Sequence, residues 1–180
     1  MKKLGVIVGS LRKDSYNKKV AEYFMQRLEG DFDINFIEIG NLELFNEDLE
    51  DNEPASWNKF RTSIKEMDAF LFVTPEYNRS IPGALKNALD VASRPFPNNE
   101  WAKKPTLLVT ASPGGIGGFG AGQHFRNIAS MLNMYVMPQP EVYLGQIHKS
   151  FDENGSLTNE RTTSFLDTVS QSFIEWTNNF

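Results

Sequence analysis

The chain of 180 residues contains no cysteine and only two histidines, His124 and His148. The lack of cysteine excludes disulfides, thiolate nucleophiles, zinc–thiolate sites and iron–sulfur clusters. The two histidines lie far apart in the sequence, so we expect no histidine-rich metal site and no bound metal. Any redox chemistry would therefore depend on a bound organic cofactor.

Long hydrophobic runs and a basic stripe are also missing. No run approaches the roughly 20 residues that cross a membrane, and the apolar stretch after the basic N-terminus, Leu4–Val8, is too short for the core of a signal peptide. The formal net charge is -5, which argues against a nucleic-acid partner. We expect one cytoplasmic domain over residues 1–180, with neither a membrane nor a nucleic acid as its partner.

Short apolar runs alternate with helical patterns along the chain. The runs predict five strands, and Val20, Phe24 and Leu28 show the four-residue spacing that is typical of the first helix. We expect strands at residues 4–8, 34–39, 69–73, 106–111 and 135–137, and helices at 17–28, 55–67, 82–92, 121–132 and 158–177. Ser80 is the predicted N-cap of the third helix.

This alternation predicts an α/β fold, a doubly wound parallel sheet with helices on both faces. Right-handed crossovers and five strands favour the flavodoxin-like strand order 2-1-3-4-5. In that order, ligands bind at the carboxyl ends of the strands, at the switch between strands one and three. The loops after strands one, three and four should meet there.

The loop after the first strand is the most informative segment. It combines a Gly-Ser turn with the hydroxyls of Ser10 and Ser15, the amide of Asn17 and the permanent charge of Arg12, just before a helix N-terminus. Such an arrangement is typical of a phosphate-binding loop. The alternative is a turn that only caps the helix, but capping alone would not require the arginine.

The loop after the third strand offers groups suited to a flat heterocycle. Pro75 and Pro82 stiffen it, Tyr77 presents an aromatic face, and Asn78 carries both a donor and an acceptor. An ordinary strand-to-helix turn, with Tyr77 packing against its neighbours, is the alternative.

The loop after the fourth strand, residues 112–120, is rich in glycine. Gly115, Gly117 and Gly120 formally match the dinucleotide motif G-x-G-x-x-G, but that motif belongs after the first strand. We instead expect close approach of backbone N–H groups to the polar edge of a ring; a flexible surface loop is the alternative. Together the three loops predict a site for a phosphorylated flat ring, best matched by FMN.

Two common alternatives lack their motifs. No G-x-x-x-x-G-K-[ST] sequence follows the first strand, which argues against a P-loop nucleotide-binding protein. No G-x-S-x-G sequence is present, which argues against a serine hydrolase. His124 falls within a predicted helix, where we interpret it as a surface or packing residue.

Two segments resemble the NAD(P)H-dependent FMN reductase family, which includes quinone, chromate and azo-dye reductases on a flavodoxin-like fold. They are Gly9-Ser10-Leu-Arg12-x-x-Ser15-x-Asn17 and Pro75-Glu76-Tyr77-Asn78-x-Ser80-x-Pro82-Gly83-x-Leu85-Lys86-Asn87, and the similarity spans about residues 4–144. The acidic stretch 47–53 and the tail after Phe151 match no pattern of the family.

The resemblance implies roles for the residues of the three loops. The phosphate would be held by Ser10, Arg12, Ser15 and Asn17. The ribityl chain and ring would lie along Pro75, Glu76, Tyr77 and Asn78, with Ser80 in the same cofactor site, and the far side of the ring near Ser112, Gly114, Gly115 and Gly117. The resemblance also implies a homodimer or homotetramer.

The hypothesis for function is hydride transfer from NADH or NADPH through bound FMN to a quinone or another small electron acceptor. No catalytic residue is assigned, because the flavin carries the chemistry. The main alternative is a flavodoxin-type electron carrier that does not oxidise NAD(P)H. A further alternative is a nucleotide-binding domain without flavin.

Overall fold

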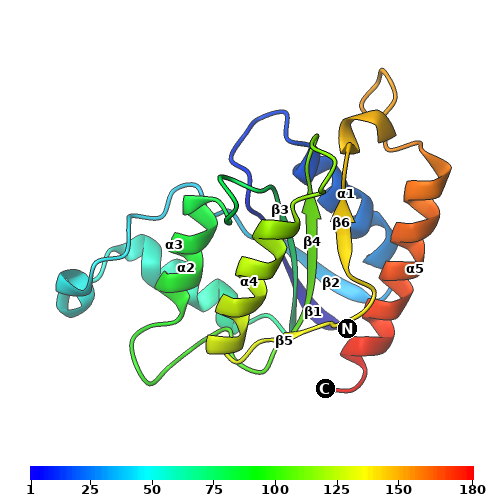
Figure 1. Cartoon of the computed structure of the whole chain (residues 1–180). Coiled ribbons are helices and arrows are strands. Elements are labelled where there is room, and N and C mark those ends of the chain that lie inside the picture. Colours follow the sequence, from blue (N-terminus) through cyan, green and yellow to red (C-terminus); the bar gives the residue numbers. More distant parts are fainter.

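A parallel sheet runs through the centre of the computed structural model, which describes residues 1–180 (Figure 1). Its strands are β1 (Lys2–Val8), β2 (Phe32–Phe36), β3 (Ala69–Thr74), β4 (Pro105–Ala111), β5 (Tyr135–Val136) and β6 (Val142–Leu144). The order is β2-β1-β3-β4-β5, with β6 also paired to β4, and every pair is parallel. The predicted flavodoxin-like order is therefore confirmed.

Helices cover both faces of the sheet, because successive strand residues point to opposite faces. Leu4, Val6 and Val8 of β1 pack in one core with α1 (Tyr16–Leu28) and α5 (Glu160–Thr177). Ile7 packs in a second core with α2 (Ala55–Lys65), α3 (Gly83–Ala92) and α4 (Phe119–Met131). Two short 3₁₀ helices, η1 (Glu47–Asn52) and η2 (Ile147–Ser150), lie in the connections.

The second and fifth strands differ most from their predicted bounds. The second strand was expected at residues 34–39 but ends at Phe36, after which Ile37 and Ile39 turn into the core on the α2 side. The fifth was expected at 135–137; it is instead divided into β5 and β6, with Pro138 and Pro140 between them. Proline has no N–H to donate to a neighbouring strand, so pairing with β4 stops and then resumes.

None of the helices combines the length and the apolar character that a membrane-spanning helix requires.

Candidate functional site

The loop between β1 and α1 contains many unpartnered backbone N–H groups. Those of Ser10, Leu11 and residues 13–17 donate no hydrogen bond within the chain. The Arg12 N–H bonds the Ser10 hydroxyl at 3.3 Å, and the Ser15 hydroxyl accepts from the Lys18 N–H at 3.4 Å, which caps α1. Free N–H groups at a helix N-terminus, beside an exposed arginine, form an anion-binding loop.

Gly9 brings this loop against the end of β3. A Cβ atom at this position would lie 2.3 Å from the Thr74 hydroxyl, so any larger residue would displace the Thr74 side chain. The Gly9 N–H donates to the Val73 carbonyl at 2.9 Å. The close approach places the loop after β1 at the β1–β3 switch, where the strand order predicts a ligand.

Asn17 connects the same loop to β4. Its Nδ2 donates to the Ala111 carbonyl at 3.2 Å, while its Oδ1 is buried without a partner, and only 5% of the residue is exposed. One of the two N–H groups of this amide nitrogen is thus engaged with β4. The free Oδ1 is available to a ligand that brings a hydroxyl or an N–H group.

The loop after β3 forms a tight turn that exposes Tyr77 and Asn78. Tyr77 and Ser80 exchange two backbone hydrogen bonds of 2.9 and 3.0 Å, and Asn78 and Arg79 between them have φ values of 51° and 67°. Two positive φ angles are typical of a type I′ turn. The turn leaves the Tyr77 side chain 46% exposed, as a platform for a ring requires.

Glu76 acts on the neighbouring loop. Its carboxylate is only 14% exposed; one oxygen accepts from the Ala121 N–H at 3.1 Å, and the other from Arg79 Nη1 at 3.3 Å. Ala121 lies in the first turn of α4, whose N-cap, Gly118, has no side chain to offer. Glu76, which is 45 residues away in the sequence, therefore caps α4 and joins the loops after β3 and β4.

Ser80 is not the N-cap of the third helix, so that prediction was wrong. α3 begins at Gly83 behind Pro82, and the backbone of Ser80 is engaged with Tyr77. The Ser80 hydroxyl lies 2.5 Å from Nδ1 of His124. His124 is exposed on α4 and thus contacts the predicted site; no local sequence pattern could indicate this, because the two residues are 44 positions apart.

The glycine-rich loop after β4 is held in a defined conformation. Gly117 and Gly118 have φ values of 68° and 81°, and Thr110 donates its hydroxyl to the Gly117 carbonyl at 2.6 Å. A Cβ atom on Gly117 would lie 2.7 Å from the backbone of Tyr143. The alternative of a merely flexible loop therefore finds no support.

One part of this loop is open. The Gly114 N–H bonds the Ser112 hydroxyl at 3.1 Å, and the Gly117 N–H faces the Gly114 carbonyl at 3.5 Å. The Gly115 N–H donates no hydrogen bond, and no atom lies within 4 Å of where its Cβ would be. Of the glycines expected to approach a ring, Gly115 is thus the one with a free donor and open space beside it.

Next to the glycine loop, Tyr143 is kept in its neutral form. Burial raises the pKa of its phenol, and the hydrogen bond that its hydroxyl donates to Glu141 at 2.9 Å raises it further. Its ring packs edge-to-face on Phe119 at 5.1 Å. This contact supports the first turn of α4 on the side that faces the β6 segment.

The loops after β1, β3 and β4 are joined by the Gly9–Thr74, Asn17–Ala111 and Glu76–Ala121 contacts. Together they offer an anion-binding loop, an exposed aromatic turn and a free backbone N–H at one edge of the sheet. The residues present therefore fit FMN. Fold and site together define a flavodoxin-like protein that binds a phosphorylated ring.

The chain belongs to the NADPH-dependent FMN reductase family, whose sequence model matches residues 2–149. A quinone reductase of Pseudomonas putida is 47% identical over 174 residues, covering 96% of this chain and 93% of the relative. A 2-hydroxy-1,4-benzoquinone reductase of a Burkholderia species is 40% identical over 174 residues, covering 97% and 95%.

A solved structure supports the same assignment. FerB, a flavoenzyme NAD(P)H:(acceptor) oxidoreductase of Paracoccus denitrificans, superposes with a TM-score of 0.92 at 38% identity, covering 99% of this chain and 98% of FerB. The predicted family is confirmed, and with it the prediction of an oxidoreductase that depends on FMN and NAD(P)H. Membership argues against the simple electron carrier.

Proposed function

We propose that this protein transfers reducing equivalents from NAD(P)H to a quinone or a similar small electron acceptor at an FMN site formed by the loops after β1, β3 and β4. The observation that carries the proposal is the set of unpartnered N–H groups of Ser10, Leu11 and residues 13–17, beside the Arg12 side chain and at the strand-order switch. The similarity to proteins named quinone reductases supports the choice of acceptor.

Each loop has a distinct task in this proposal. Ser10, Arg12 and the N–H groups of residues 13–17 bind the phosphate, and Ser15 fixes the start of α1. Tyr77, Asn78 and the Gly115 N–H contact the ring. When bound, FMN supplies the capacity to accept a hydride from NAD(P)H and to pass it to an oxidant.

Other predicted residues act by positioning in this proposal. Glu76 and Ser112 orient the glycine loop, since they accept hydrogen bonds from the Ala121 and Gly114 N–H groups. Pro75 and Ser80 shape the turn that carries Tyr77, while Gly114 and Gly117 permit the path of the loop after β4. A well-positioned backbone N–H near the ring stabilises negative charge that develops there.

Arg12→Ala tests the phosphate site. Removing one charge-assisted hydrogen bond is expected to cost about 2 kcal/mol, roughly a thirtyfold rise in the FMN dissociation constant. Riboflavin, which has no phosphate, should bind both proteins with the same weak affinity. Arg161→Ala on α5 removes an exposed arginine elsewhere and is the matched control. An unchanged dissociation constant in Arg12→Ala would contradict the assignment.

The visible spectrum tests the activity. Purified protein with FMN should show the flavin bands, lose them on addition of NADPH without oxygen, and regain them with a quinone. Flavin that binds but does not bleach would identify a carrier. Comparing NADH with NADPH in the same experiment would determine the preferred donor.

The homo-oligomer and the cytoplasmic location remain predictions. Ile116 and Phe119, beside the proposed ring site, are 60% and 46% exposed, so an adjoining subunit could cover them. Light scattering after size-exclusion chromatography would measure the assembly, and cell fractionation the location. A monomer at micromolar concentration would contradict the first prediction.

A further inference from the structure

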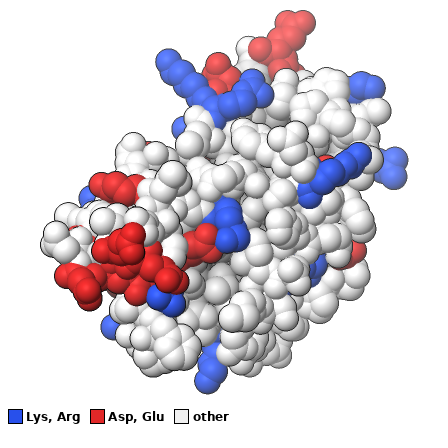
Figure 2. All heavy atoms as spheres, turned by 60° about the vertical axis from the view of Figure 1, so that its left-hand side comes forward, with Lys and Arg blue, Asp and Glu red and all other residues white.

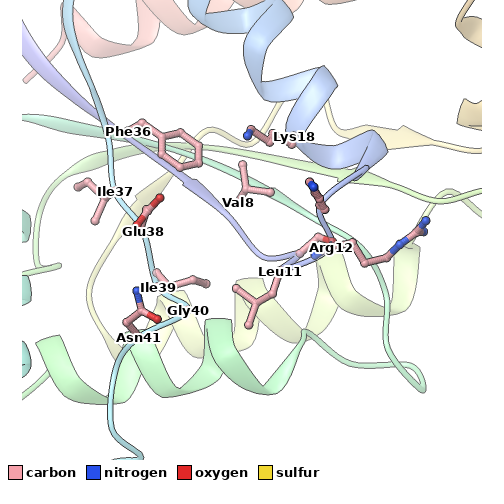
Figure 3. A pocket seen from close by; sticks show the side chains of 12 residues that line it. Val8, Leu11, Arg12, Lys18, Phe36, Ile37, Glu38, Ile39, Gly40 and Asn41 are labelled. Atoms are coloured by element: carbon pink, nitrogen blue, oxygen red, sulfur yellow. The ribbon is translucent and has the colours of Figure 1, made fainter. Parts of the chain in front are cut away.

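A cavity of 410 Å³ opens on the side of β1 away from the predicted flavin ring. It lies between residues 10–13 of the proposed phosphate-binding loop and residues 36–41, the last residue of β2 and the segment that follows it (Figure 3). The loops after β3 and β4 lie on the opposite side of β1, because β2 and β3 flank it. The cavity therefore begins at the phosphate site and leads away from the ring.

The cations around this cavity exceed what one phosphate needs. Arg12, Lys13 and Lys18 line it, and none of them forms an ion pair within the chain. A single phosphate carries at most two charges and already has the free N–H groups of the loop. Lys13 and Lys18 are thus available for a second phosphate joined to the first.

The rest of the lining suits a nucleoside. Phe36 and Leu11, 43% and 59% exposed, offer apolar surface to a flat base. Glu38 is the only acidic residue of the lining, and it follows the second strand of a β–α–β unit. An acidic residue at that place accepts hydrogen bonds from ribose hydroxyls in nucleotide-binding folds. Asn41 provides a donor and an acceptor for the edge of a base.

We propose that this cavity binds an adenosine 5′-phosphate unit attached to the phosphate in the loop, so that the protein takes FAD as well as FMN. The inference rests on the proposed FMN site, because the ring must lie toward β3 and β4 for the adenylate to lie toward β2. Its volume falls within the 300–1,000 Å³ typical of small-molecule sites. NAD(P)H contains the same adenylate, but its phosphates would compete with FMN for the loop.

Flavin titrations of the apoprotein test this, with quenching of flavin fluorescence as the readout. We expect FAD to bind within about tenfold of FMN in affinity. Asn41→Trp, at an exposed position, fills the cavity and should raise the FAD dissociation constant by about tenfold or more while changing that of FMN less than about twofold. Asn127→Trp on α4 is the control for bulk and should change neither.

A second variant tests the cavity without a bulky insertion, in case Asn41→Trp disturbs folding. Phe36→Ser removes the apolar wall without adding volume and should also weaken FAD selectively. Binding of FMN but not FAD would overturn the inference and leave the FMN site intact, whereas binding of neither would also overturn the proposed phosphate site. Equal FAD affinity in all variants would overturn the location of the adenylate.

A further titration distinguishes the two sources of an adenylate. ADP is added to the FMN-loaded protein, with Asn41→Trp for comparison. If FAD fails to bind while ADP binds and the tryptophan abolishes that binding, the cavity serves the adenylate of NAD(P)H and the FAD proposal is wrong. FAD binding to the apoprotein with no ADP binding to the loaded protein supports it.

Discussion

Asn17 illustrates how one side chain can join binding to stability. It lies in the first turn of α1, within the proposed phosphate-binding loop, yet its amide nitrogen donates to the carbonyl of Ala111, the last residue of β4. A buried amide with one unpaired atom is unfavourable unless a ligand or water completes it. The resemblance to FMN reductases implies a phosphate contact, whereas in the structure one of its two N–H groups donates to the Ala111 carbonyl.

Asn17→Asp should separate these roles at nearly constant volume. The new carboxylate faces the Ala111 carbonyl instead of donating to it, so we expect a loss of about 2 kcal/mol in the free energy of unfolding. The added negative charge near the phosphate should weaken FMN by about tenfold or more. Urea denaturation and FMN titration measure the two effects. Asn127→Asp, exposed on α4, is the control, and equal values for both variants would contradict the assignment.

At the scale of elements, the start of α4 depends on a residue from another loop. Its own N-cap is a glycine in the left-handed region, and the nearest acceptor for its first-turn N–H groups is Glu76. A carboxylate at this end also interacts favourably with the helix dipole. Since α4 follows the glycine loop, the capping contact also sets the position of that loop relative to Tyr77.

Glu76→Ala should lower the free energy of unfolding by about 1 kcal/mol, the usual effect of losing a helix cap. Glu76→Gln keeps an oxygen acceptor and loses only the charge, so its loss should be smaller, about 0.3–1 kcal/mol. Chemical denaturation measures the free energy of unfolding, which should be highest for the wild type, lower for Glu76→Gln and lowest for Glu76→Ala. If the two variants were equally stable, the hydrogen bond to Ala121 would not be the cause.

Gly120→Ala tests the same contact from the helix side. An added Cβ would lie 2.9 Å from a Glu76 carboxylate oxygen and 3.3 Å from the Arg79 carbonyl, so the cap must shift. We expect a loss of stability of about 1 kcal/mol despite the better helix propensity of alanine. Gly83→Ala is the matched control. Gly83 lies in the first turn of α3, and no atom lies within 4 Å of where its Cβ would be, so this change should be neutral or stabilising. The thermal unfolding midpoints of the two variants and of the wild type measure this difference, and equal midpoints for the two variants would contradict the contact.

At the scale of the whole molecule, the charges are unevenly spread. Acidic side chains gather at one end (Figure 2), where η1 contributes Glu47, Asp48, Glu50 and Asp51. This segment, which matched no family pattern, is fixed to the body because Arg94 bonds Glu50 at 2.6 and 3.0 Å. None of these acidic residues lines the cavity beside Arg12, Lys13 and Lys18.

A second long-range contact joins the first and last helices. Asp167 of α5 accepts hydrogen bonds from the Tyr23 hydroxyl at 2.7 Å and from Arg27 Nε at 2.8 Å, both on α1. The Tyr23 hydroxyl, followed by Arg27, lowers the pKa of Asp167. Because the folded pKa is below the unfolded one, this contribution to stability is present above the ordinary range of an aspartate and is lost as the pH falls through the folded value.

Asp167→Asn should therefore be less stable than wild type at pH 7, while the two proteins converge once the pH has fallen below the lowered pKa of Asp167. Since the carboxylate is half exposed, the difference at pH 7 should not exceed about 1 kcal/mol. Urea denaturation at several pH values measures the convergence. Asp31→Asn, an exposed position without an ion pair, is the control. A pH-independent difference would contradict the role of the Asp167 charge.

The sequence by itself determined the strand order, the position of most helices and the three loops of the proposed site, because periodicity and loop composition are local properties that survive without tertiary contacts. Only the tertiary structure decided the end of β2, the division between β5 and β6, and the cavity behind the phosphate loop. It also decided the partners of Asn17, Glu76 and His124, which lie 94, 45 and 44 residues away. Such contacts depend on how the loops meet at the edge of the sheet, and no local pattern encodes them.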